Sequence, residues 1–169
     1  MRDDKVFIIK IKPDGENSFA FCQEKGLIGI GWKLDNGIPK TLDDYERLRG
    51  EENRKFSNEA SLSRALNVFK ELENGGLIWT ISPDKEYYLC KTDGKYSYHG
   101  DKDEYIEADV INCLDCVFYK IGASTIVPSK IIDMMRFPGT AKSTDDDIAV
   151  KTTFDIYNLI CRKINNSAI

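Results

Sequence analysis

The stretch 19-FAFCQEKGLIGIGWKL-34 decides how the chain is interpreted, because it joins a strand-like apolar run to closely spaced glycines and a tryptophan. Within it, Gly29 and Gly31 give up packing side chains and raise the entropic cost of ordering the strand predicted at 27–32. Bare backbone lets a flat ligand or a second backbone approach, and Trp32 at the strand end offers a face for stacking. The alternative is that Trp32 closes one end of the fold while the glycines relieve crowding at a sheet corner.

The composition is that of a single globular domain spanning residues 1–169. Of the 169 residues, 41% are hydrophobic and 31% are charged, which is typical of a soluble domain with its own core. We recognise neither a signal peptide nor an apolar run near the roughly 20 residues of a membrane-spanning helix, so we expect a cytoplasmic protein with no membrane partner. The five cysteines are an odd number, which favours reduced thiols over a disulfide framework.

Hydrophobic periodicity and turn residues predict the secondary structure of the first half of the chain. The elements expected there are strands at 6–12 and 27–32, a short strand or helical turn at 19–23, a short helix from Thr41 to about Gly50, and a longer helix from Asn58 to about residue 74.

The second half is predicted as a meander of strands followed by helices. Its strand segments are rich in Tyr, Ile, Val and Trp, and the turn sequences at 82–85 and 92–95 are typical of hairpins. The expected elements are strands at 76–82, 86–92, 95–100 and 110–121, a short helix at 129–135, and a C-terminal helix at about 145–165. Because no regular β-α-β alternation is present, we expect an α+β fold with a strongly curved or barrel-like sheet.

Signals for catalysis and metal binding are weak. The single histidine, His99, lies on a predicted turn without a nucleophile motif around it, and no phosphate-binding glycine loop is present. Cys113 and Cys116 have a zinc-like spacing, but a second such pair is missing and the surrounding run is apolar. We therefore expect no metal and no cofactor, and we regard an enzyme as the less favoured interpretation.

Aromatic residues carry the stronger functional signal. Trp32 and Trp79 are candidates for stacking on a planar base, and Tyr96 belongs to a group of tyrosines near Trp79. With a formal net charge of −4, a nucleic-acid partner would need a local basic face. The candidates for that face are Arg47, Arg49, Arg54, Lys55 and Arg64, then Arg136 and Lys142, and finally Arg162 and Lys163.

The quoted residues resemble a known family. The run F-x-x-C-x-x-x-G-L-I-G-I-G-W from Phe19 to Trp32, the helix L-x-x-A-L-x-x-F from Leu62 to Phe69, and the segment 75–98 are similar to PUA-like domains of the EVE and YTH type. The likeness is closest to the domains found in prokaryotic modification-dependent restriction systems of the McrB and Mrr kinds. It covers roughly residues 6–143. Two departures are Gly76, where the family commonly has Asp, and the lack of a tryptophan in 111–120.

The resemblance implies a small mixed, mostly antiparallel β-barrel with flanking helices, whose core spans about 6–143. Several members extrude a modified base and hold it in an aromatic cage. By likeness, Trp32 would form a cage wall lined by Ile30 and Gly31, with Trp79 as a second wall or a core residue, and Tyr96 as a further ligand-binding candidate. The expected contacts to the nucleic-acid backbone are Arg136, Lys142, Arg54 and Lys55.

The leading hypothesis is a noncatalytic reader of a modified base in DNA or RNA, acting in prokaryotic defence with a separate nuclease or motor protein as its possible partner. The second is a protein-interaction or regulatory module that keeps the fold and has lost nucleic-acid binding. A third, with less support, is a small enzyme that uses His99 near Asp101 and Asp103.

Overall fold

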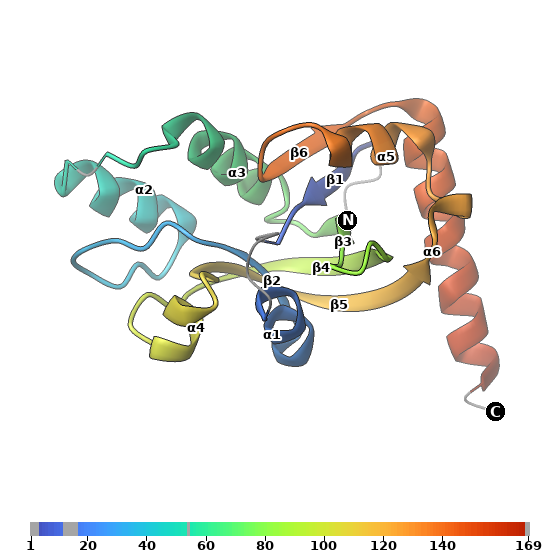
Figure 1. The fold of residues 1–169 in the computed structure, drawn as a ribbon, viewed down its shortest axis with the longest axis horizontal. Helices are drawn as coiled ribbons and strands as arrows, with labels where there is room; N and C mark the ends of the chain where they lie inside the picture. Colours follow the sequence, from blue (N-terminus) through green and yellow to red (C-terminus); the bar gives the residue numbers. More distant parts are fainter. Residues whose placement is uncertain (1–3, 12–16, 54, 168–169) are drawn as a thin grey trace.

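A six-stranded mixed sheet with helices on both faces organises the protein, as a computed structural model shows (Figure 1). The structure describes residues 4–11, 17–53 and 55–167. Over these residues the strands are β1 (Val6–Ile9), β2 (Leu27–Ile30), β3 (Gly76–Ile81), β4 (Tyr87–Tyr98), β5 (Asn112–Gly122) and β6 (Ala141–Thr144). The helices are α1 (Ser18–Lys25), α2 (Leu42–Glu51), α3 (Glu59–Glu71), α4 (Asp103–Glu107), α5 (Ser129–Arg136) and α6 (Asp147–Ser167), with a short 3-10 helix at Ser124–Ile126.

The strand order is β2-β5-β4-β3-β1-β6. Only β1 and β3 run parallel, and all other neighbours are antiparallel. This confirms the predicted combination of helices with a mixed, mostly antiparallel sheet. Because β2 and β6 each pair with a single strand, the sheet formed by the described residues is open, and the expected closed barrel is not shown.

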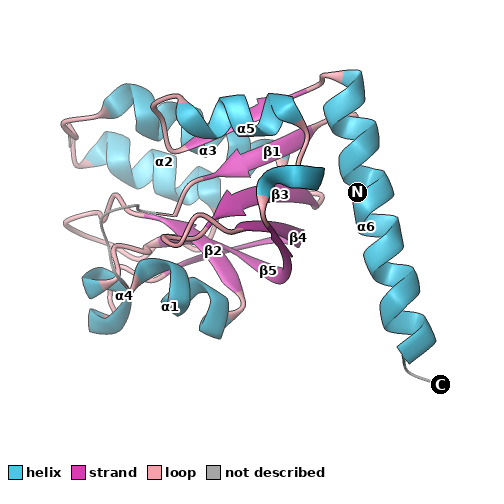
Figure 2. Cartoon of the chain, turned by 45° about the vertical axis from the view of Figure 1, so that its right-hand side comes forward, coloured by secondary structure: helices cyan, strands magenta, loops and turns pink. Residues whose placement is uncertain are grey.

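The two faces of the sheet support two separate hydrophobic cores (Figure 2). Along β1, Phe7 and Ile9 belong to the core that includes residues of α1, α2 and α3, whereas Val6 and Ile8 belong to the core that includes residues of α5 and α6. The alternation follows from the two-residue period of a strand, which sends successive side chains to opposite faces. Because β1 is buried on both faces, its sequence V-F-I-I is continuously apolar.

Trp79 lies in the core beneath α6. Its side chain is fully buried, and the indole Nε1 donates a hydrogen bond of 2.9 Å to Thr153 Oγ1 on α6. A buried indole usually satisfies its N–H in this way. Of the two roles predicted for Trp79, a second wall of the base pocket or a core residue, the structure shows the core residue. Its place as a ligand-binding residue is therefore corrected.

The hairpin turn predicted at 92–95 is wrong. Instead of turning back, β4 continues through it, and the register against β5 shifts between Thr92 and Tyr96. Thr92 Oγ1 accepts a hydrogen bond of 3.0 Å from the Gly94 N–H and donates one of 2.6 Å to the Asp115 carbonyl oxygen. Because these bonds stabilise the irregularity, the Asp-Gly sequence forms a bulge within one long strand.

Three elements were missing from the sequence-based prediction: the short helix α4, the 3-10 helix at Ser124–Ile126 and the edge strand β6. β6 pairs antiparallel with β1, with Ile8 opposite Lys142. The strand or turn expected at 19–23 is part of helix α1. The sequence P-D-G at 13–15, which is typical of a turn after the first strand, lies outside the described residues. No helix in the described part of the chain has both the length and the apolar character needed to cross a bilayer.

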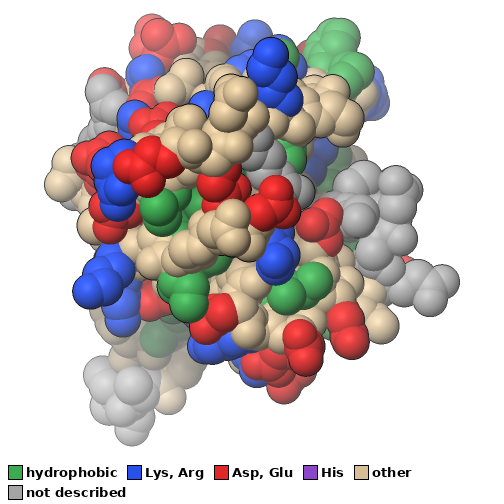
Figure 3. All heavy atoms as spheres, turned by 90° about the vertical axis from the view of Figure 1, so that its left-hand side faces the viewer, with side chains coloured by type: hydrophobic (Ala, Val, Ile, Leu, Met, Phe, Trp, Pro, Cys, Tyr) green, Lys and Arg blue, Asp and Glu red, His purple; other side chains and the backbone are tan. Residues whose placement is uncertain are grey.

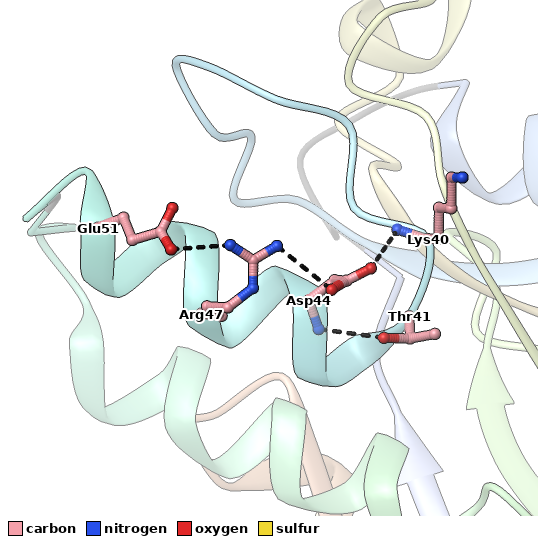
Figure 4. Close-up of polar contacts among 5 residues, drawn as sticks. All are labelled: Lys40, Thr41, Asp44, Arg47 and Glu51. Atoms are coloured by element: carbon pink, nitrogen blue, oxygen red, sulfur yellow. Dashed lines mark hydrogen bonds and ion pairs between the residues drawn. The ribbon is translucent and has the colours of Figure 1, made fainter.

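Helix α2 begins as predicted, because Thr41 caps it. Thr41 Oγ1 accepts a hydrogen bond of 3.1 Å from the Asp44 N–H, which satisfies one of the free donors in the first turn (Figure 4). On the same helix Arg47 lies between two carboxylates, 3.4 Å from Asp44 Oδ1 and 2.8 Å from Glu51 Oε1. Figure 3 views the side of the molecule from which α2 projects, and there acidic and basic side chains are interspersed.

Candidate functional site

A cavity of about 570 Å³ opens beside Trp32. Five segments line it: the residue after β1, the end of β2 with the two residues that follow, the first turn of α3 with the loop before it, the loop between α4 and β5, and the loop between α5 and β6. The lining includes the charged residues Lys10 and Asp109, the aromatic residue Trp32 and the hydroxyl residue Ser61. Its volume lies in the range of small-molecule sites, about 300–1,000 Å³, so it can hold a planar base and part of a sugar.

Trp32 is the aromatic wall of this cavity. The side chain is half-buried, packs partly against the core on the α3 face, and lines the cavity. Its φ of 65° lies in the left-handed region that bulky residues avoid. Such strain costs about 1–3 kcal/mol and persists only where the surroundings hold the residue in place.

Side-chain hydrogen bonds hold the strained segment. Tyr45 donates its hydroxyl to the Trp32 carbonyl oxygen at 2.8 Å, and the Tyr98 hydroxyl accepts from the Leu34 N–H at 2.9 Å. The buried Asn112 donates Nδ2 to the Gly31 carbonyl oxygen at 2.7 Å. The backbone on both sides of the Trp32 peptide unit is therefore positioned by rigid elements of the fold.

Tyr96 acts on the cavity through Asn112. Its hydroxyl donates to Asn112 Oδ1 at 2.7 Å, while the other end of that amide holds the Gly31 carbonyl. The Tyr96 ring itself lines a second, smaller cavity of about 250 Å³, together with Leu42 and Phe69. Burial raises the pKa of Tyr96, so its hydroxyl stays protonated and able to donate.

Gly29 and Gly31 lie close to other residues of the chain, which leaves no room for a side chain at either position. A Cβ on Gly29 would collide with the Val110 side chain and lie 3.0 Å from Cys113 Sγ. A Cβ on Gly31 would lie 2.9 Å from Asp109 Cγ. The bare backbone at Gly29 therefore serves packing, and that at Gly31 makes room for a carboxylate.

Asp109 is one of the residues of this cavity that sequence reasoning missed. It follows α4, where its N–H donates to the Ile106 carbonyl at 3.1 Å, and its φ of 52° is again in the left-handed region. The Ala108 carbonyl just before it accepts a hydrogen bond of 2.7 Å from Ser18 Oγ. These contacts hold the Asp109 carboxylate on the cavity wall beside Gly31.

Further polar and aromatic groups come from the start of α3. Phe56, Asn58 and Ser61 line the cavity. The loop that carries Phe56 is held by Glu59, which accepts a hydrogen bond of 2.7 Å from the Phe56 N–H and pairs with Arg49 at 2.9 Å. The cavity thus combines two aromatic rings with amide, hydroxyl and carboxylate groups.

Only some of the ligand-binding residues predicted from the sequence line this cavity. Ile30, Gly31 and Trp32 line the cavity together, as expected, whereas Trp79 and Tyr96 do not. Among the predicted backbone contacts, Arg136 is exposed on α5 and lies 3.6 Å from Asp133, and Lys55 is exposed beside Phe56. Lys142 lies on β6 near the cavity edge, and Arg54 lies outside the described residues.

The cysteines and the histidine considered for metal binding or catalysis are buried or partly buried. Within the described ranges no group of three or more His, Cys, Asp or Glu side chains could hold a metal ion. Burial raises the pKa of Cys22 to about 12 and raises the pKa of Cys113 as well, which keeps both thiols protonated. His99 stacks on Tyr105 with ring centroids 4.0 Å apart, and burial together with Lys102 lowers its pKa.

We expect Tyr45→Phe to lower the free energy of unfolding by about 1–3 kcal/mol, because it leaves the Trp32 carbonyl without its hydroxyl donor. The phenyl ring still fills the buried position. Urea unfolding measures the change, and Tyr119→Phe, on a half-buried ring elsewhere in the sheet, is the matched control. Equal stability of Tyr45→Phe and the wild type would contradict the assigned role of this hydrogen bond.

Comparison with protein-family models, with curated proteins and with solved structures found no match to this chain.

Proposed function

We propose that this protein is a noncatalytic nucleic-acid-binding module that holds an extruded, modified base in the cavity beside Trp32. The observation that carries the proposal is that two non-glycine residues with left-handed backbone, Trp32 at φ 65° and Asp109 at φ 52°, line the same cavity. Local strain of this kind clusters at binding sites, where the surrounding structure maintains it.

The chemistry of the cavity suits a nucleobase. An indole stacks on any base, and one such contact contributes about 1–3 kcal/mol. The Asp109 carboxylate accepts hydrogen bonds from N–H groups, such as the exocyclic amine of cytosine, while Asn58 and Ser61 can donate and accept. Together these interactions offset the few kcal/mol that unstacking a base requires, a cost that is lowest for a modified or unpaired base.

We further propose that the fold is related to the PUA-like domains of the EVE and YTH type. Support comes from the mixed, mostly antiparallel sheet with helices on both faces and from the G-I-G-W sequence at the cavity. The Gly76 departure has a packing reason, because a Cβ there would lie 2.7 Å from Leu72 Cδ2. In this proposal the protein works in a prokaryotic restriction or defence system, and a separate nuclease or motor protein supplies cleavage.

Direct binding to a panel of short strands tests the proposal. The panel contains single-stranded and duplex DNA and RNA with methylated or hydroxymethylated cytosine, methylated adenine, or no modification, and fluorescence anisotropy reports binding at low salt. We expect one modified strand to bind at least about tenfold more tightly than its unmodified counterpart. Absence of binding to every strand would overturn the proposal, and a co-purifying protein partner would then favour the protein-interaction module.

We expect Asp109→Asn to weaken binding of the preferred strand by about 10- to 150-fold, because hydrogen bonds to charged groups contribute about 1.5–3 kcal/mol. Asparagine tolerates the left-handed backbone at this position, so the fold is retained. Glu107→Gln, which removes the same charge from an exposed residue of α4, is the matched control and should change the affinity less than about twofold. Equal effects of the two variants would show that only net charge matters.

A further inference from the structure

Three cationic side chains converge at the edge of the Trp32 cavity. Lys10 follows β1 and lines the cavity, Lys142 lies on β6, and Arg64 lies on α3. The pairing of β1 with β6 brings the first two together: Ile8 is opposite Lys142, and the Lys10 N–H donates to the Thr140 carbonyl at 2.8 Å. Helix α3 packs against β6 and brings the third.

Contacts of Lys142, and the helix position of Arg64, place these two side chains near the cavity. A Cβ on Gly139, which lines the cavity, would lie 3.5 Å from Lys142 Cε, so the Lys142 side chain runs along the cavity edge. Arg64 is one helical turn after the cavity-lining Ser61, which puts the two side chains on the same side of α3. Lys10 Nζ donates to the Phe137 carbonyl oxygen, and Lys142 Nζ lies 5.4 Å from the Phe137 ring centroid.

The three cations influence one another electrostatically. Burial lowers the pKa of Lys10, and the charge of Lys142 lowers it further. Burial also lowers the pKa of Lys142, with an additional contribution from Arg64. Neighbouring like charges disfavour the charged forms, and a bound anion would relieve the repulsion.

Among the described residues, no ion pair or hydrogen bond joins Lys10, Lys142 or Arg64 to an Asp or Glu side chain. Arg47 shows the contrast, because Asp44 and Glu51 hold its guanidinium on both sides (Figure 4). In a chain with a formal net charge of −4, three neighbouring cations that pair with no carboxylate of the described residues favour an anionic ligand.

We propose that Lys10, Lys142 and Arg64 form an anion subsite that binds a phosphate group attached to, or next to, the base held beside Trp32. The identity of that base rests on the proposed function, whereas the subsite itself does not. Arg64 supplies a planar fork that can hold two phosphate oxygens, and the two ammonium groups supply point charges. Phosphate at this position fixes the register of the strand, and the cavity then selects the base.

Inorganic phosphate is the first probe. Amide NMR spectra of the wild type are recorded with phosphate and with chloride at matched ionic strength. We expect phosphate to shift the signals of Lys10, Arg64, Gly139 and Lys142 in the wild type and in Trp32→Ala. In Lys142→Gln the signals of Lys10, Arg64 and Gly139 should stay unshifted. The spectrum also confirms that each variant is folded.

Short strands are the second probe, with one strand that carries the preferred base and one that is abasic at the same position. We expect Lys10→Gln, Lys142→Gln and Arg64→Gln each to weaken binding of both strands by about three- to tenfold and to reduce the salt slope by about one. Lys120→Gln removes the same charge from an exposed lysine that pairs with Glu86 at 2.6 Å, and it should have less than about a twofold effect. Since Arg64 is exposed, Arg64→Gln keeps the test available if a lysine variant unfolds.

The outcomes separate the two proposals. Trp32→Ala should weaken binding of the strand with the base and leave the abasic strand unaffected, whereas the subsite variants weaken both. If Trp32→Ala has no effect while Lys142→Gln weakens the abasic strand, the subsite stands and the base pocket fails. A response of the strands identifies a phosphodiester, and a response to inorganic phosphate alone identifies a free phosphate ligand. No response to either probe overturns the subsite.

Discussion

Replacing Trp32 with alanine is expected to weaken binding of the preferred modified strand by about 5- to 150-fold, since one stacked base contributes about 1–3 kcal/mol. The loss should be much smaller for strands without the modified base, because their affinity comes mainly from phosphate contacts. Fluorescence anisotropy with the preferred and the unmodified strand measures both effects. Unchanged affinity for the preferred strand would contradict the base-binding proposal.

The backbone of Trp32 provides the control for folding. Because Trp32 has a φ of 65°, glycine at this position removes the left-handed penalty that alanine retains. We therefore expect Trp32→Gly to be more stable than Trp32→Ala by about 1 kcal/mol, while both lose the stacking surface. If both variants are folded and both fail to select the modified base, the loss belongs to the indole and not to the fold.

Replacing Gly94 with alanine is expected to destabilise the protein by about 3 kcal/mol or more, because strain and overpacking act together. Gly94 has a φ of 85°, and a Cβ there would lie 2.5 Å from the Glu73 carbonyl carbon and collide with two backbone carbonyl oxygens at the end of α3. Backbone atoms cannot turn aside as a side chain can. Urea unfolding measures the loss.

Two other glycines separate the causes. Gly122 has a φ of 93° and open space around it, so Gly122→Ala should show the cost of strain alone, about 1–2 kcal/mol. Gly50 is helical with nothing near it, and Gly50→Ala should raise the stability by about 0.5–1 kcal/mol. A Gly94→Ala variant no less stable than Gly122→Ala would contradict the close packing of β4 on α3.

Elements with local determinants could be predicted from the sequence. Helix α2 is one, because its cap Thr41 and the first-turn residue Asp44 are three positions apart and need no distant partner. The edge strand β6 is the opposite case: its sequence A-K-S-T has no strand signature, and it is extended because it pairs with the free edge of β1. The Asp-Gly at 93–94 likewise fits a hairpin locally, and only the pairing of β4 with β5 on both sides makes it a bulge.

The same distinction applies to the candidate site. Trp32 could be predicted because an aromatic residue directly after Gly31 stands out in the local sequence, at the end of the strand predicted at 27–32. Asp109 and Lys10 could not, since they reach the cavity through the α4–β5 loop and through the β1–β6 pairing. Gly31 did carry some information, because a glycine in an apolar strand often indicates that another group lies close to the backbone. The sequence does not show that this group is the Asp109 carboxylate.

The emission of Trp32 tests the central claim most directly. In a Trp79→Phe variant Trp32 is the only tryptophan, and it is half-buried at the cavity. The variant is titrated with the preferred strand and with its abasic counterpart until anisotropy shows that each is fully bound. We expect strong quenching by the strand that carries the base and little change with the abasic strand. Equal emission changes with both strands, or none with either, would contradict a base stacked on Trp32.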